Sequence, residues 1–130
     1  GEQRSSGSLA GKMIIAVDFD GVITPNGHWP SVGEANTAVI DWLKELRESG
    51  NKLILWTNRV GEALQTAVEF CRGYGLEFDT VNENLPEIID YFGGDCRKVY
   101  ANFYIDDRAV CMKFEGKEAT DERIREQNYR

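Results

Sequence analysis

Two carboxylates stand two positions apart at the end of the first apolar run of this 130-residue chain. The run Ile14–Val17 leads directly into Asp18, and Asp20 follows after one intervening residue. Residues i and i+2 of an extended chain point to the same side, so we expect the two carboxylates to converge beyond the end of a strand. Close carboxylates repel each other unless a cation lies between them or one of them holds a proton. The pair therefore predicts a metal site.

A simpler interpretation treats both aspartates as turn or helix-capping residues, because Asp is common directly after strands. The polar residues that follow later apolar runs separate the two interpretations. They are Thr57 and Asn58 after residues 52–56, and Asp106 and Asp107 after residues 99–105, with Lys98 directly before the last run. Such an inventory suits Mg²⁺ and a phosphate, because carboxylates bind the hard cation while a hydroxyl and an ammonium group face phosphate oxygens.

The elements that must bring these residues together alternate between strand and helix. Apolar runs predict strands over residues 14–17, 52–56, 78–81 and 99–105, and helical spacing or helix-start signals predict helices over residues 34–49, 61–72 and 86–91. This alternation predicts an α/β fold, a Rossmann-like three-layer sandwich with a mostly parallel sheet and right-handed crossovers. The carboxyl ends of parallel strands share one edge, so we expect the polar residues to meet there.

The first predicted helix has apolar residues at helical spacing, which assigns it an inner face of Ala35, Ala38, Val39, Trp42, Leu43 and Leu46. After residue 108 the pattern favours a turn or short strand near residues 110–114 and a charged helix from about Thr120. Residues 1–12 are rich in Gly and Ser and are interpreted as a tag or disordered leader. The single predicted domain therefore spans residues 13–130.

Composition narrows the class of protein. The formal net charge of −7 argues against a basic nucleic-acid-binding face. No apolar run approaches the roughly 20 residues of a membrane-spanning helix, and we identify no secretory signal. The three cysteines fit neither a disulfide framework nor metal-ligand spacing, which favours reduced thiols in a cytoplasmic protein without a membrane partner.

The polar clusters also occur in a recognisable order. DFDGVI at residues 18–23 resembles the first motif of the haloacid dehalogenase-like (HAD) phosphohydrolase superfamily, and LWTNR at residues 55–59 resembles the second. Lys98 stands where the third motif supplies its lysine, and YIDD at residues 104–107 is similar to the acidic fourth motif. The resemblance spans residues 14–107 in the order typical of that superfamily, and it implies a HAD-like fold and a Mg²⁺-dependent phosphatase.

Carried over to this chain, the resemblance implies a role for each motif residue. Asp18 would be the nucleophile that forms an aspartyl-phosphate, and Asp20 would protonate the leaving oxygen and then deprotonate the hydrolytic water. A carboxylate nucleophile of this kind needs nearby cations to cancel its repulsion with phosphate. Thr57, the backbone near Asn58, and Lys98 would bind the transferring phosphoryl group. Magnesium would be held by Asp18, by the backbone carbonyl of Asp20, by Asp106 and, directly or through water, by Asp107.

The spacing between the motifs leaves no room for the cap domain that many members of the superfamily carry. Only 36 residues separate Asp20 from Thr57, and only 40 separate Thr57 from Lys98. We therefore expect a capless, open site, covered at most by a flap at residues 24–30 or by a second subunit of a homo-oligomer. The substrate would be a phosphorylated compound of unidentified class, and an open site suits a large one.

Other residues carry two interpretations each. Arg59 is close enough to the second motif to bind a substrate anion, but an arginine near a helix start is equally ordinary. His28 and Trp29 of the flap could contact substrate or pack on the domain surface, and Asn82 and Asn84 could line the site or serve in turns and caps. For the whole chain, the alternative is a catalytically silent HAD-like domain with a binding or structural role.

Overall fold

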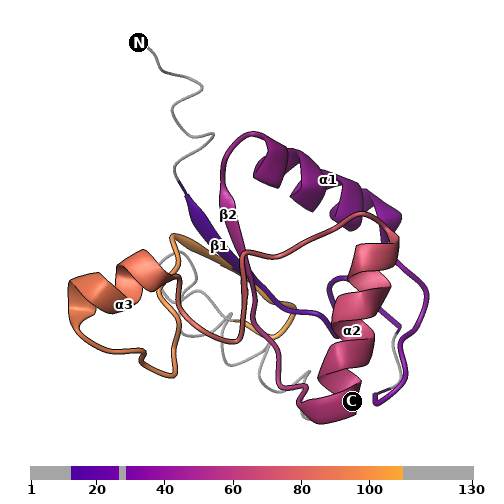
Figure 1. Ribbon diagram of the computed structural model, residues 1–130. Helices are drawn as coiled ribbons and strands as arrows, with labels where there is room; N and C mark the ends of the chain where they lie inside the picture. The colour runs from indigo at the N-terminus through magenta and orange to yellow at the C-terminus, as the bar shows by residue number, and fades with distance from the viewer. Residues whose placement is uncertain (1–12, 27–28, 110–130) are drawn as a thin grey trace, which may run out of the picture.

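The computed structural model describes residues 13–26 and 29–109, and Figure 1 shows their path. The predicted leader at residues 1–12, the flap residue His28, and the strand and helix predicted beyond residue 110 lie outside the described residues. The domain boundaries at residues 13 and 130 therefore remain a prediction.

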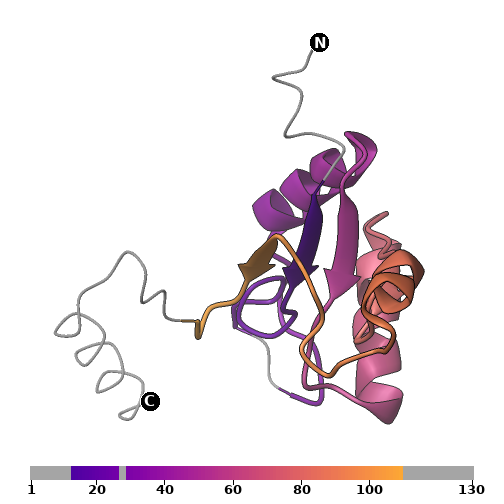
Figure 2. The same cartoon turned by 90° about the vertical axis from the view of Figure 1, so that its left-hand side faces the viewer.

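Four parallel strands form the centre of the described structure: β1 (Ile14–Val17), β2 (Lys52–Leu55), β3 (Thr80–Val81) and β4 (Phe103–Ile105), in the order β3-β2-β1-β4. Figure 2 shows β1 between β2 and β4, with all three strands pointing the same way. Val17, the last residue of β1, pairs with Leu55 of β2 and with Ile105 of β4. The residues that follow these three strands therefore start from one level of the sheet, and the predicted parallel α/β fold is confirmed.

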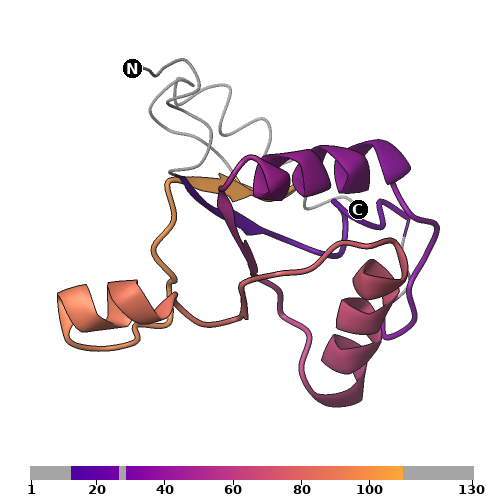
Figure 3. The same ribbon diagram turned by 45° about the horizontal axis from the view of Figure 1, so that its top comes forward.

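Three helices cover the two faces of the sheet: α1 (Thr37–Glu48), α2 (Gly61–Gly73) and α3 (Pro86–Phe92). α1 and α2 lie on one side of the strands and α3 on the other (Figures 1 and 3). Successive strand residues face opposite sides, so one core cluster joins Val17 to Leu43 of α1, and a second joins Ala16 to Ile88 of α3. Among the described residues, no helix has the length and apolar character needed to cross a membrane.

The inner face of α1 differs from the predicted one. Asn36 caps the helix by accepting a hydrogen bond from the Val39 amide at 3.3 Å, so the helix begins later than predicted. Ile40 and Leu43 are its buried residues, whereas Trp42 is 47% exposed and lines an apolar groove beside β4. Apolar residues flank Leu43 in both directions around the helix, so spacing alone did not identify the flank that faces the sheet.

The last strand is shorter than predicted. Only the last three residues of the predicted run 99–105 pair with β1. Backbone groups ahead of them bond to side chains instead: the Tyr104 hydroxyl donates to the Val99 carbonyl at 2.6 Å, and the Tyr100 amide donates to buried Asn84 at 2.7 Å. These side-chain partners replace the hydrogen-bond ladder of a longer strand.

Candidate active site

Three carboxylates converge at the carboxyl ends of β1 and β4. One oxygen from each of Asp18, Asp106 and Asp107 lies within 4.8 Å of the other two. The pairing of β1 with β4 produces this arrangement, because the Asp18 amide continues the ladder by donating to the Ile105 carbonyl at 2.9 Å. Residues 88 positions apart in the sequence are thus brought together at the sheet edge where ligands of α/β proteins bind. We call Asp18, Asp106 and Asp107 the metal group. They are three of the four carboxylates that were predicted for the site.

A glycine in the loop after β1 leaves room for one carboxylate of the metal group. Gly21 has a φ of +89°, and a β-carbon built there would overlap the Asp107 carboxylate. The missing side chain is therefore what admits Asp107 to the group. The three carboxylates offer oxygen donors of the kind that hard divalent cations such as Mg²⁺ and Ca²⁺ bind. The residues present accordingly suit a divalent hard cation.

The electrostatics of Asp18 reflect its position in the group. Burial, together with the nearby negative charges of Asp106, Asp107 and Asp20, raises the pKa of Asp18 from its ordinary 3.8 to about 6. The Phe19 amide, which donates to Asp18 Oδ1 at 2.8 Å, opposes this shift by favouring the charged form. A proton and a cation therefore compete for the Asp18 carboxylate.

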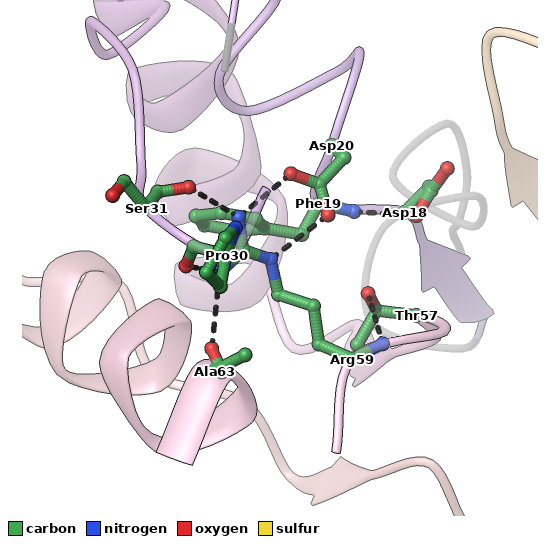
Figure 4. A network of polar contacts seen from close by, with 8 residues as sticks. All are labelled: Asp18, Phe19, Asp20, Pro30, Ser31, Thr57, Arg59 and Ala63. Carbon is green, nitrogen blue, oxygen red and sulfur yellow. Dashed lines mark hydrogen bonds and ion pairs between the residues drawn. The ribbon is translucent and has the colours of Figure 1, made fainter. Parts of the chain in front are cut away.

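The carboxylates of Asp18 and Asp20 turn to different partners. Asp20 accepts hydrogen bonds from Arg59 on both oxygens, from Nε at 2.9 Å and from Nη2 at 2.8 Å (Figure 4). Its carboxylate is not part of the group that Asp18 forms with the β4 aspartates. The Asp20 side chain therefore faces Arg59 and does not join Asp18 beside the β4 aspartates. That the backbone carbonyl of Asp20 binds the metal stays a prediction.

Arg59 lies in the interior and not at the substrate side. Its side chain has no exposed surface, and its guanidinium also donates to the carbonyls of Pro30 at 2.7 Å, Ser31 at 2.6 Å and Ala63 at 3.1 Å. All five guanidinium N–H groups are therefore used, two of them on Asp20. No guanidinium donor remains for a substrate anion in this arrangement, and anion binding by Arg59 stays a prediction.

Thr57 follows β2 and is held by a residue from the next strand end. Its amide donates to Asn82 Oδ1 at 2.8 Å, and its hydroxyl oxygen accepts from the Arg59 amide at 3.2 Å. Asn82 has a left-handed φ of 56°, which Asn tolerates better than most residues. The Thr57 hydroxyl hydrogen remains available for a phosphate oxygen, and neighbouring Asn58 is exposed.

Lys98 lies beside the ring of Tyr104 in β4. Its exposed side chain places Nζ 5.4 Å from the centre of the Tyr104 ring. Lys98, Asp106 and Trp56 line the same cavity of about 360 Å³. No ion pair between Lys98 and Asp18 occurs in the described part of the chain. The predicted lysine thus shares a cavity with one metal-group carboxylate without touching the predicted nucleophile.

Comparison with known proteins places the chain in a family. Neither a protein-family model nor a curated protein matches the sequence. A solved structure of a conserved protein from Bacteroides thetaiotaomicron is similar to it, with 40% sequence identity and a TM-score of 0.67. The similarity covers 88% of this chain and 91% of the Bacteroides protein. The chain belongs to the same family as that conserved protein.

Two residues of this family member position the site in ways that the sequence did not indicate. Gly21 directly follows Asp-x-Asp, and a glycine at such a position is a signal for close backbone approach that the apolar pattern does not reveal. Asn82 was expected either to line the site or to serve in a turn or cap. Its side chain accepts a hydrogen bond from the Thr57 amide and so holds the backbone of Thr57 in place.

The structure gives the burial of two other residues with open interpretations, Asn84 and Trp29. Asn84 is buried and bonds Asp95 at 2.8 Å, so its contacts are structural. Trp29 is 62% exposed in the flap.

Proposed function

We propose that this protein is a Mg²⁺-dependent phosphomonoester hydrolase of the HAD type, working through an aspartyl-phosphate on Asp18. The observation that carries the proposal is the convergence of Asp18, Asp106 and Asp107 at one sheet edge. Thr57 comes two residues after the end of the neighbouring strand β2, whose last residue, Leu55, pairs with Val17 of β1. The resemblance of the four motifs to that superfamily supports the assignment of the reaction.

The first half-reaction transfers the phosphoryl group to the protein. A carboxylate oxygen of Asp18 attacks phosphorus, and the bond from phosphorus to the ester oxygen breaks. Asp20, in its protonated form, gives its proton to the departing oxygen, so that the product leaves as an alcohol. Asp18 is left as an acyl phosphate and Asp20 as a carboxylate.

The second half-reaction restores the protein. Asp20 accepts a proton from a water molecule as that water attacks the phosphorus of the acyl phosphate. The bond between phosphorus and the Asp18 oxygen breaks, inorganic phosphate leaves, and Asp18 returns as a carboxylate. Asp20 again holds a proton, so protons and charges balance over the cycle.

Phosphoryl transfer depends on position and on neutralising charge more than on covalent catalysis by the protein. The residues fit for a magnesium ion are Asp18, Asp106 and Asp107, and the ion, when bound, would reduce the repulsion between the anionic phosphate and Asp18. The Thr57 hydroxyl donates to a phosphate oxygen, and Lys98 contributes positive charge from the adjacent cavity.

Hydrolysis of p-nitrophenyl phosphate tests the proposal. We expect turnover in Mg²⁺, none in excess EDTA, and a loss of at least about 10³-fold in Asp18→Asn. Asp41→Asn, at an exposed position of α1, is the matched control and keeps full activity. Acid-quenched protein analysed by mass spectrometry should carry one phosphoryl group on the peptide that contains Asp18.

Two outcomes contradict the proposal. Undiminished turnover by purified Asp18→Asn excludes this nucleophile. Folded wild-type protein that binds Mg²⁺ but hydrolyses no ester in a broad phosphomonoester panel supports the alternative of a catalytically silent HAD-like domain.

A further inference from the structure

Arg59 connects three segments through one buried guanidinium. It bonds both oxygens of Asp20, the carbonyls of Pro30 in the flap and of Ser31 directly after it, and the Ala63 carbonyl in the first turn of α2. Figure 4 shows the guanidinium lying between these groups. A flap segment and the Asp20 carboxylate are therefore bound to the same planar group and cannot shift independently without breaking hydrogen bonds.

The environment of Arg59 makes its position well defined. The side chain is completely buried, and the guanidinium carbon lies 4.9 Å from the centre of the Phe19 ring. A buried cation is tolerated when it is paired and its donors are satisfied, and Asp20 supplies the paired charge in its carboxylate form, which the proposed cycle reaches after the first half-reaction. Arginine suits this geometry because its planar fork matches a carboxylate in a bidentate fashion, whereas a lysine offers a single point charge.

The Asp20 side chain remains 33% exposed although both of its oxygens are bonded to Arg59. Each carboxylate oxygen has a second lone pair, so the two bonds to Arg59 leave acceptor positions free. Arg59 therefore orients the carboxylate from behind without occupying its whole hydrogen-bonding capacity. That arrangement suits a positioning residue and does not suit a substrate ligand.

We propose that Arg59 is a positioning residue that sets the orientation of Asp20 and fixes Pro30 and Ser31, at the end of the flap, to it. The inference rests on the proposed function, in which Asp20 transfers protons to and from the reacting oxygens. A displacement of about 1 Å in a proton-transfer group costs on the order of 10²-fold in rate. Arg59 acts on the reaction through Asp20 alone, and it contributes nothing to holding the cation.

Kinetics of Arg59→Lys test this role. We expect kcat for p-nitrophenyl phosphate to fall about 10²-fold with KM changed less than about twofold. Mg²⁺ affinity, measured by calorimetry with the metal alone, stays within about twofold, because Arg59 does not touch the metal group. Arg72→Lys, on the exposed end of α2, is the matched control and retains wild-type kinetics.

A double-mutant cycle separates action through Asp20 from an independent effect. Adding Arg59→Lys to Asp20→Asn should cause no further loss of kcat, since the group that Arg59 orients is already inactive. A multiplicative loss in the double variant, or a rise in KM at unchanged kcat in Arg59→Lys, would overturn the proposal by indicating direct contact with substrate.

Hydrogen exchange of the flap gives a readout that needs no enzyme activity. We expect amides in the peptide over residues 29–36 to exchange at least about tenfold faster in Arg59→Lys, with β1 and β2 unchanged. Asp20→Asn, which keeps Arg59 and alters a partly exposed position, should accelerate the same peptide to a smaller degree. Unchanged flap exchange in both variants contradicts the link even if the wild type proves to have no phosphatase activity, whereas inactivity alone contradicts only the proposed function.

Discussion

The Asp107 carboxylate occupies the space where a side chain on residue 21 would begin. Gly21 presents its bare α-carbon to that carboxylate at a φ of +89°, directly after the Asp-x-Asp pair. The loop after β1 and the residue after β4 therefore fit together only when position 21 has no β-carbon. A backbone feature of one strand end thus determines whether an aspartate from another strand end can join the metal group.

Gly21→Ala is expected to weaken Mg²⁺ binding by about 10-fold to 100-fold, because displacing Asp107 alters the donor geometry. Calorimetric titration with Mg²⁺ measures the effect. Gly93→Ala is the matched control, since Gly93 also has a positive φ of +80° but an added β-carbon meets nothing within 4 Å. Gly93→Ala should reproduce the backbone strain without the loss of metal affinity. Equal losses in both variants would show that strain alone is responsible.

Mg²⁺ affinity should fall as the pH is lowered through about 6. Burial and the neighbouring carboxylates raise the pKa of Asp18 to about 6, so below that pH a proton occupies the carboxylate that the cation needs. Affinity is expected to be nearly constant above pH 7 and to decrease about tenfold for each pH unit well below 6. Titrations between pH 5 and pH 8 check this, and a flat profile over that range would exclude Asp18 as a ligand.

Asp18→Asn should stabilise the metal-free protein above pH 6. The folded-state pKa of Asp18 is about 6 and its ordinary value is 3.8, so the folded state binds the proton more tightly than the unfolded state. Ionisation of Asp18 consequently lowers stability as the pH rises from about 4 to 6. Solvent screening of this half-buried group limits the gain in Asp18→Asn to about 1 kcal/mol. Urea unfolding at pH 7.5 and at pH 4 in EDTA should show the gain only at the higher pH.

Asn84→Ala should lower the free energy of unfolding by about 2–3 kcal/mol, because several hydrogen bonds of a buried amide are lost. The Asn84 side chain bonds Asp95, the Cys96 carbonyl and the Tyr100 amide, which together hold the connection between α3 and β4. Urea unfolding measures the loss, with exposed Asn26→Ala as the control. A change below about 0.5 kcal/mol would show that water replaces these partners.

The strands and the order of the motifs could be predicted because they depend on local patterns. Val17 ends an apolar run and Asp18 begins a polar one, and the parallel sheet then places strand ends at one level. The metal group followed from these two facts. Side-chain partners across the site did not, because nothing near Arg59 in the sequence indicates that its guanidinium reaches Asp20 and the Pro30 carbonyl.

The shortened β4 has the same explanation. Residues 99–101 are apolar enough for a strand, but a long-range bond to Asn84 and local bonds to the Tyr104 hydroxyl engage their backbone groups. Such competition between a side chain and a hydrogen-bond ladder depends on tertiary contacts and leaves no periodic signal. The same holds for Ile40, whose burial depends on where α1 rests on the sheet.

The residues of the site follow strands that are held in the sheet to different degrees. Among the described strands, β1 and β2 have neighbours on both sides, whereas β4 pairs only with β1 over three residues and is largely exposed. Strands of this kind open first in native-state fluctuations. Opening of β4 would carry Asp106 and Asp107 away from Asp18 and Thr57, so the release of a bound cation would be coupled to local opening of this strand. Cation binding and the pairing of β4 with β1 would then be coupled. A bound ion would stabilise β4 at this edge of the described sheet.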